Sequence, residues 1–331
     1  MDSNEKLLIN RRHALMLGSS LVAGLFAADL SRAATKQMDQ GANADLSSPQ
    51  GASASPYKLP AKQMEEILRS EGTVMDGVLS LSQDRTDLHV VNAEGIPFKP
   101  AWQVNHEFAF QSIGKNKTIV NCELSLLSRE ANPVMDQLIK HGLSFQAFHQ
   151  HFFDLSPQIF HIHFRGVGHP IELARAIAAV VSVTGTPLPQ KPPVNPQSPL
   201  DKNKLEKILG GTAEIADDGV VIVSIPRKET IMLGGIALKS DTGVSHTVAF
   251  QPLDGEKRTA AAPDFALIAA EINPVMQEMR AQGFTIHCLY NQETAESPQL
   301  YFSHQLAVGD AYDLARKIRK GLELTNTKFK S

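Results

Sequence analysis

The sequence predicts an α+β fold built from two tandem copies of a ferredoxin-like α/β sandwich with antiparallel sheets. Aligning residues 132–177 with residues 273–318 without a gap gives fifteen identities in forty-six positions, which indicates duplication of one structural unit. Each copy also alternates strand-like runs of period two with helix-like runs of period 3.6, in the order βαββα. We therefore expect helices on one face of an antiparallel sheet in each copy.

Composition divides the 331 residues into five segments. Residues 60–185 and 201–326 form the two predicted domains. Between them, residues 186–200 contain six of the nineteen prolines, which leave few backbone donors for regular structure and predict a linker. Residues 34–59 are polar and poor in apolar side chains, so we expect a disordered spacer. Residues 1–33 have the layout of an export signal.

The predicted signal consists of Arg11 and Arg12, an apolar run over residues 14–28, and a small-x-small cleavage motif at residues 31–33. The arginine pair partly matches a twin-arginine signal, although Ala14 stands where that signal usually has Phe. Since the apolar run is shorter than the roughly 20 residues of a membrane span, we expect no permanent membrane anchor. The predicted location is periplasmic or extracellular.

The first copy shows the expected elements most clearly. We predict a strand at 118–127, a helix at 130–140 ending at Gly142, strands at 143–153 and 158–165, and a helix at 171–181. Alternation along the first strand places Asn121, Glu123 and Ser125 on the face away from the helices. Asn132-Pro133, and Asn273-Pro274 in the second copy, are interpreted as helix caps with Pro in the first turn.

Histidines are concentrated between His149 and His163, where four of the twelve lie within fifteen residues. A hairpin with its turn near Ser156 would place His151 opposite His161 and His149 opposite His163. All four imidazoles and Glu123 then share one face, while the intervening apolar residues point to the other: Phe148, Phe152, Phe160, Ile162 and Phe164.

Three imidazoles on neighbouring strands are a ligand arrangement that zinc sites use, and a fourth position can hold water. His149, His151 and His163 are the candidate metal ligands, with His161 or Glu123 completing the site. Glu123 or Glu107 is the candidate general base. Copper also suits imidazole ligands. The alternatives are therefore a metal-dependent hydrolase, a non-catalytic copper, zinc or small-ligand binding protein, and a structural module in which these histidines only cover a strand.

Charge and cysteine content narrow the range of partners. The formal net charge is -3 with no basic stripe, so we do not expect nucleic acid or anionic membranes as partners. We expect a metal ion or a small molecule instead. Cys122 and Cys288 lie in different copies, where either a disulfide or two buried thiols would fit. Motifs typical of serine hydrolases, phosphate-binding loops and His-Glu-x-x-His proteases are absent from the sequence.

Several motifs resemble the LppY/LpqO family, a bacterial family of unknown function named after two mycobacterial lipoproteins. The first copy carries Glu123, the Glu-x-Asn-Pro-Val run at 130–134, Phe-His-Gln-His at 148–151 and His-Ile-His-Phe at 161–164. The resemblance covers both copies, roughly residues 60–325, and implies no specific activity. Gln150 stands where the family pattern has Asn, and the chain lacks a lipid-anchor cysteine.

The second copy retains only part of the candidate ligand set. His304 and Asp264 match His163 and Glu123, whereas His149, His151 and His161 are replaced by Tyr290, Gln292 and Phe302. One imidazole and one carboxylate are too few for a tight site. We therefore expect the second copy to be structural, or to line the site across the interface through Tyr290 and Gln292.

Overall fold

The computed structural model describes residues 57–191, 195–254 and 257–330. All three ranges belong to one compact unit, residues 45–331. The predicted export signal and nearly all of the predicted spacer lie outside the described residues, as do residues 192–194 of the linker. No helix within these ranges is long and apolar enough to cross a membrane.

The first repeat contains three helices around a six-stranded antiparallel sheet of order β1-β2-β5-β6-β9-β7, together with a small three-stranded sheet of order β4-β3-β8. Its elements in chain order are α2 (Ala61–Leu68), β1 (Gly72–Met75), β2 (Val78–Asp84), β3 (Val90–Asn92), β4 (Pro97–Phe98), β5 (Asn105–Gly114), β6 (Lys117–Leu126), α3 (Ser128–Lys140), β7 (Ser144–His149), β8 (Leu155–Ser156), β9 (Phe160–Gly168) and α4 (Pro170–Val181).

The second repeat has the same two sheets, of order β10-β11-β14-β15-β18-β16 and β13-β12-β17. Its elements are α5 (Lys202–Leu209), β10 (Thr212–Ile215), β11 (Val221–Ile225), β12 (Met232–Leu233), β13 (Ile236–Ala237), η1 (Ser240–Thr242), β14 (His246–Asp254), β15 (Arg258–Leu267), α6 (Ala269–Ala281), β16 (Thr285–Ile286), β17 (Glu296–Ser297), β18 (Tyr301–Gly309) and α7 (Ala311–Leu322). The predicted tandem α+β architecture with antiparallel sheets is confirmed.

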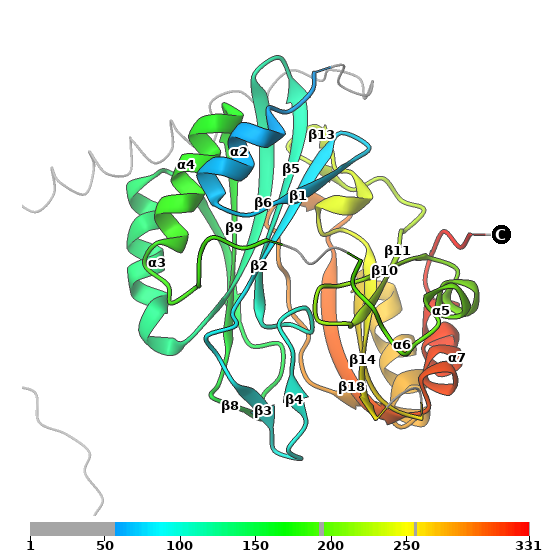
Figure 1. Cartoon of the computed structure of the whole chain (residues 1–331). Coiled ribbons are helices and arrows are strands. Elements are labelled where there is room, and N and C mark those ends of the chain that lie inside the picture. Colours follow the sequence, from blue (N-terminus) through cyan, green and yellow to red (C-terminus); the bar gives the residue numbers. More distant parts are fainter. Residues whose placement is uncertain (1–56, 192–194, 255–256, 331) are drawn as a thin grey trace, which may run out of the picture. The chain divides into compact units, whose positions relative to one another are not determined.

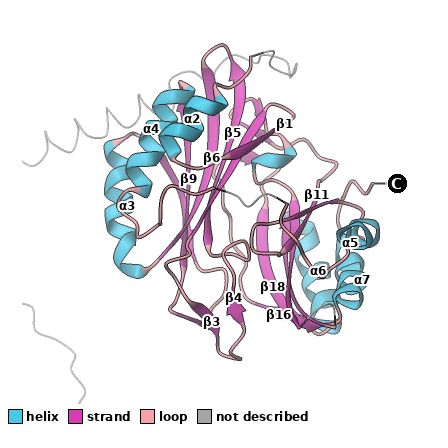
Figure 2. Cartoon of the chain, in the orientation of Figure 1, coloured by secondary structure: helices cyan, strands magenta, loops and turns pink. Residues whose placement is uncertain are grey.

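Each large sheet carries its helices on one face only, as Figures 1 and 2 show. In the first repeat, the predicted inward-facing residues of β6, Val120, Cys122, Leu124 and Leu126, all belong to the core beneath α2, α3 and α4. An equivalent core lies beneath α5, α6 and α7. Alternation along β6 therefore leaves Asn121, Glu123 and Ser125 on the opposite face, which faces the other repeat.

The two repeats are joined through the helix-free faces of their sheets. One apolar cluster combines the small sheet of the first repeat, including Phe98 and Leu155, with Ala249 and Ala262 of the second. Two glutamines make matching clamps: Gln251 accepts from Lys99 N, and Gln111 accepts from Lys239 N, each at 2.9 Å. The second repeat is thus packed against the face that carries Glu123.

A buried arginine in each repeat fixes the start of the helix that follows the central strand. Both terminal nitrogens of Arg85 contact the Glu130 carboxylate at 2.9 Å, and Glu130 also accepts from Leu127 N at 2.8 Å. Arg227 and Glu271 repeat the arrangement. The predicted Asn-Pro caps are wrong, because α3 and α6 begin at Ser128 and Ala269 and place Pro133 and Pro274 inside the helix.

Candidate metal centre

The candidate ligands come from three neighbouring strands and the loop after β7. Glu123 on β6 lies opposite His163 on β9, and Ser125 lies opposite His161. His149 ends β7 and lies opposite His161. The predicted pairing of His149 with His163 and of His151 with His161 is therefore wrong.

Two local features cause this difference. A register shift between Phe145 and Ala147 displaces the pairing of β7 with β9. The segment between these strands is also not a tight turn, because Leu155 and Ser156 leave to pair with β3. His151 consequently lies beyond the end of β7, in a loop, and its position depends on that loop.

The aromatic residues of this segment do not all face the helices as predicted. Ile162 and Phe164 do belong to the core beneath the helices. Phe152 is instead buried in the cluster between the repeats, and its ring packs edge-on to His304. Phe148 is 44% exposed. The excursion through β8 carries Phe152 away from the face that strict alternation would give it.

The structure brings all five predicted site residues together. Candidate ligand atoms of His149, His151 and His163 lie within 4.8 Å of one another, and so do those of Glu123, His151 and His161. His151, His161 and His163 are 1%, 1% and 5% exposed, while the Glu123 side chain is 23% exposed. This histidine and glutamate cluster could hold a metal ion.

Several ring nitrogens of the cluster have no hydrogen-bond partner within the described ranges. These buried atoms are both ring nitrogens of His149 and Nε2 of His161 and of His163. Leaving a buried polar atom unsatisfied costs about 1–3 kcal/mol, so such atoms are uncommon in proteins. A cation among them would satisfy several at once.

Ring geometry separates the two possible ligand groups. With zinc–nitrogen distances of about 2.0–2.1 Å, two imidazole centres on one tetrahedral ion are about 5 Å apart. The ring centres of His149 lie 5.0 Å from those of His151 and of His163, and the ring centres of His151 and His163 lie 6.3 Å apart. The ring centres of His151 and His161 instead lie only 3.4 Å apart, which is too close for two imidazole ligands of one tetrahedral ion. The group formed by His149, His151 and His163 fits zinc better.

Glu123 lies where a fourth ligand belongs. Its Oε1 is 3.5 Å from His151 Nε2, and its Oε2 is 3.6 Å from His163 Nε2. These separations are long for hydrogen bonds but close to the about 3.3 Å between adjacent ligand atoms of a zinc tetrahedron. Oε1 also lies 2.9 Å from Nδ1 of His161, so His161 orients Glu123.

Burial controls the charge state of the cluster. It lowers the pKa of His149 to about 2 and that of His161 to about 3, and lowers the pKa of His151 and His163 well below the usual value. The imidazoles are therefore neutral near pH 7, as metal ligands must be. Burial also raises the pKa of Glu123 to about 8. A bound cation would favour ionised Glu123.

Glu107 is the second carboxylate of this face, directly opposite Glu123 on the neighbouring strand. Desolvation by the surrounding strands, followed by the charge of Glu123, raises the pKa of Glu107 to about 7, although the residue keeps part of its surface exposed. Asn105 donates to its Oε1 at 3.1 Å. No hydrogen bond or ion pair recorded within the described ranges joins Glu107 to a histidine of the cluster, so Glu107 contributes charge next to the site.

The second repeat covers the cluster, as one of the sequence alternatives proposed. The Tyr290 ring stacks on His149 with centres 3.6 Å apart, and His304 stacks on His151 at 3.7 Å. His304 Nε2 lies 3.7 Å from Asp264, a pair that repeats the spacing of His163 and Glu123. Gln292 is engaged elsewhere, because its amide donates to the Gly243 carbonyl.

Sequence reasoning missed Gln103, which accepts a hydrogen bond from His151 Nδ1 at 2.7 Å. Gln103 is 48 residues from His151 in the chain, and no motif surrounds it. Gln103 stands out in the structure by its left-handed backbone, φ 77°. The sequence does not reveal this conformation. Cys122 and Cys288 are free thiols in the structure.

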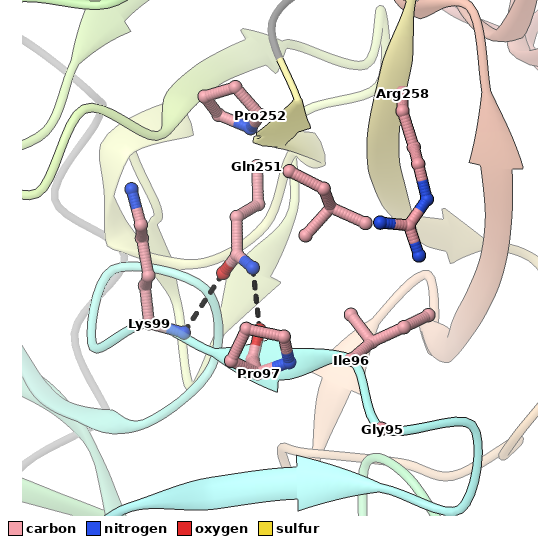
Figure 3. A pocket seen from close by; sticks show the side chains of 8 residues that line it. Gly95, Ile96, Pro97, Lys99, Gln251, Pro252 and Arg258 are labelled. Carbon is pink, nitrogen blue, oxygen red and sulfur yellow. Dashed lines mark hydrogen bonds between the residues drawn. The ribbon is translucent and has the colours of Figure 1, made fainter.

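One surface pocket lies away from the cluster, at the seam between the repeats, and is lined by Gly95, Ile96, Pro97, Lys99, Gln251, Pro252, Leu253 and Arg258. Figure 3 shows Gln251 bridging to Lys99 and Pro97 across it. The second pocket lies between α2 and residues 189–191. Neither pocket has a histidine in its lining.

Fold and site together define a duplicated α+β protein with a histidine–carboxylate cluster in its first repeat, covered by the second. The family described as "Domain of Unknown Function (DUF1259)" matches residues 62–183 and again residues 203–324. The chain belongs to this family and contains two tandem copies of its domain. No curated protein and no solved structure matches the chain.

Proposed function

We propose that this protein binds one transition-metal ion per chain, with zinc the best fit, through His149, His151 and His163. Glu123 is the fourth ligand or lies beside it, and His161 orients Glu123. The observation that carries the proposal is the convergence of neutral imidazoles at buried positions, where both ring nitrogens of His149 and Nε2 of His163 have no hydrogen-bond partner in the described part of the chain. Ring-centre separations of 5.0 Å fit a tetrahedral ion.

The test is elemental analysis of the full chain after loading with zinc and removal of free metal. We expect one equivalent of zinc in the natural sequence and none after replacing both His149 and His151 by alanine, because two of three imidazole ligands are lost. The matched control replaces two exposed histidines, His141 and His169, and should retain the metal. Stoichiometric zinc in the first double variant would refute the ligand assignment.

Two activities fit such a centre. If Glu123 is a ligand, the protein closes the coordination sphere and acts as a non-catalytic zinc or copper binder. If Glu123 remains free, it is the candidate general base of a metal-dependent hydrolase, since it is more exposed than the buried histidines beside it. A Glu123→Gln variant separates these cases: a large loss of zinc affinity supports a ligand, and unchanged affinity supports a base.

We also propose that the protein is exported and acts outside the cytoplasm, on the basis of the arginine pair, apolar run and cleavage motif of residues 1–33. N-terminal sequencing of protein produced by its natural host should give a start at Ala34. A start at Met1 would refute export through a cleaved signal. We further propose that the chain is related to the LppY/LpqO family. The motifs that carry this resemblance include the histidines of the cluster and Glu123.

A further inference from the structure

The loop between β4 and β5 connects the candidate metal centre to the second repeat. Trp102 in this loop is fully buried in the cluster between the repeats. Four hydrogen bonds hold the loop to the second repeat: Lys99 N to Gln251 at 2.9 Å, Lys99 Nζ to the Asp218 carbonyl at 2.7 Å, Ala101 N to the Asp218 carboxylate at 3.0 Å, and Trp102 Nε1 to the Ala249 carbonyl at 3.3 Å. These contacts come directly before Gln103 in the chain and fix the position of its backbone.

Gln103 directs its side chain at His151. Its amide oxygen lies 2.7 Å from His151 Nδ1, and its backbone carbonyl accepts from Ser125 Oγ at 3.5 Å. The residue has φ 77°, a left-handed conformation that costs on the order of 1–3 kcal/mol for a residue other than glycine. Strain of this kind persists where surrounding contacts impose it, often at functional sites.

The chemistry of this hydrogen bond fixes the tautomer of His151. In the structure the Gln103 amide oxygen faces His151, and because an amide oxygen only accepts, Nδ1 of His151 carries the proton in this arrangement. In a neutral imidazole the lone pair is then on Nε2. Nε2 is the atom that lies 3.5 Å from Glu123 Oε1 and 3.4 Å from the Tyr290 hydroxyl. The lone pair thus faces the space in which the proposed ion would be bound.

We propose that Gln103 is a positioning residue that fixes His151 as the Nδ1–H tautomer and so keeps Nε2 available as a metal ligand. The metal part of this inference rests on the proposed function; the tautomer part does not. Metal-binding histidines commonly donate their second N–H to a carbonyl or carboxylate oxygen, and loss of that partner typically weakens metal affinity 10- to 100-fold. Here the partner comes from a loop that the second repeat anchors.

The first measurement uses the metal-free full chain labelled with ¹⁵N-histidine. Long-range ¹H–¹⁵N correlation spectra identify which ring nitrogen carries the proton, and a His151→Gln variant assigns the signals. We expect His151 to be the Nδ1–H tautomer in the natural sequence and to lose this preference in Gln103→Leu. Protonation at Nε2 in the natural sequence would overturn the proposal.

The second measurement is zinc affinity by competition with a chelator. Gln103→Leu should bind zinc about 10- to 100-fold more weakly, and Gln103→Glu should retain affinity because a carboxylate accepts the same hydrogen bond. Gln103→Asn distinguishes loss of the side-chain hydrogen bond from a change in backbone conformation. Asn tolerates the left-handed conformation but is too short to reach His151. Affinity in Gln103→Asn equal to the natural value would overturn the proposal.

The two measurements also distinguish this inference from the proposed function. If the natural chain shows the Nδ1–H tautomer but takes up no zinc, the metal proposal fails and the role of Gln103 in fixing His151 stands. If zinc binds with full affinity in both Gln103→Leu and Gln103→Asn, the metal proposal stands and the role of Gln103 fails.

Discussion

His161 and His163 are two residues apart on β9, yet their replacement should have very different effects on zinc binding. His163 has a ring 5.0 Å from that of His149 and a buried Nε2 without a partner in the described ranges. The ring centre of His161 lies only 3.4 Å from that of His151, which is too close for two imidazole ligands of one tetrahedral ion. His163→Ala therefore removes a ligand, whereas His161→Ala removes only the contact that orients Glu123.

The size of the difference follows from typical zinc energetics. Structural zinc sites bind with about 10–16 kcal/mol through four ligands, so one ligand contributes roughly 2.5–4 kcal/mol. At about 1.4 kcal/mol per tenfold change, His163→Ala should weaken binding by roughly two to three orders of magnitude. His161→Ala removes the 2.9 Å contact with Glu123, and loss of such a supporting contact costs about tenfold or somewhat more.

Chelator competition with the two single variants, side by side, measures both affinities under one condition. Each variant removes one buried imidazole from the same strand, so differences in folding cost largely cancel; urea unfolding of the metal-free variants checks this. Equal losses, or a greater loss for His161→Ala, would show that the ion uses the group formed by Glu123, His151 and His161. The ring-geometry argument would then be refuted.

Three further predictions follow from the contacts between and within the repeats. Glu130→Ala, and separately Glu271→Ala, should destabilise the protein by about 1.5–3 kcal/mol in urea unfolding, because each buried arginine loses one of its two carboxylate partners and keeps the other, Asp87 or Glu229; Glu172→Ala, at an exposed ion pair, should cost less than about 1 kcal/mol. Tyr290→Phe should tighten zinc binding about 2- to 10-fold, because the phenol donates to the His151 lone pair that an ion would take; a tenfold loss would instead make Tyr290 a ligand. Residues 201–331 expressed alone should show no cooperative unfolding transition and no tight zinc binding, because they expose their side of the cluster between the repeats.

The duplication and the face of each strand could be read from the sequence because both are local properties. Alternation along β6 correctly placed Val120 with the helices and Glu123 with the histidines. The predicted pairing of His149 and His151 failed for two reasons: β7 pairs with β9 through a register shift, and the excursion through β8 leaves His151 in a loop beyond the strand. Such a shift adds a residue without adding a recognisable residue type, so composition gives no warning of it.

The Glu-x-Asn-Pro-Val motif shows a different limit. Asn-Pro suggested a cap, whereas the residue that organises the helix start is Glu130, paired with Arg85 at a distance of 45 residues in the chain. The signal was present, since both copies have an arginine just after a strand, Arg85 after β2 and Arg227 after β11, followed later by the motif glutamate. Pairing residues retained by both copies would have found this ion pair. Such pairing could not have found Gln103, because its role depends on the loop between β4 and β5, which the second repeat anchors.

The two copies of the fold contribute differently to the candidate metal centre. Each repeat leaves one sheet face without helices, and the two faces cover each other, with Gln111 and Gln251 making equivalent clamps in opposite directions. In this arrangement Tyr290 and His304 occupy the space above His149 and His151, so the second copy covers the histidines of the first. Tyr290 therefore serves as a packing residue at this seam, because its ring stacks on His149 and its hydroxyl lies 3.4 Å from His151 Nε2.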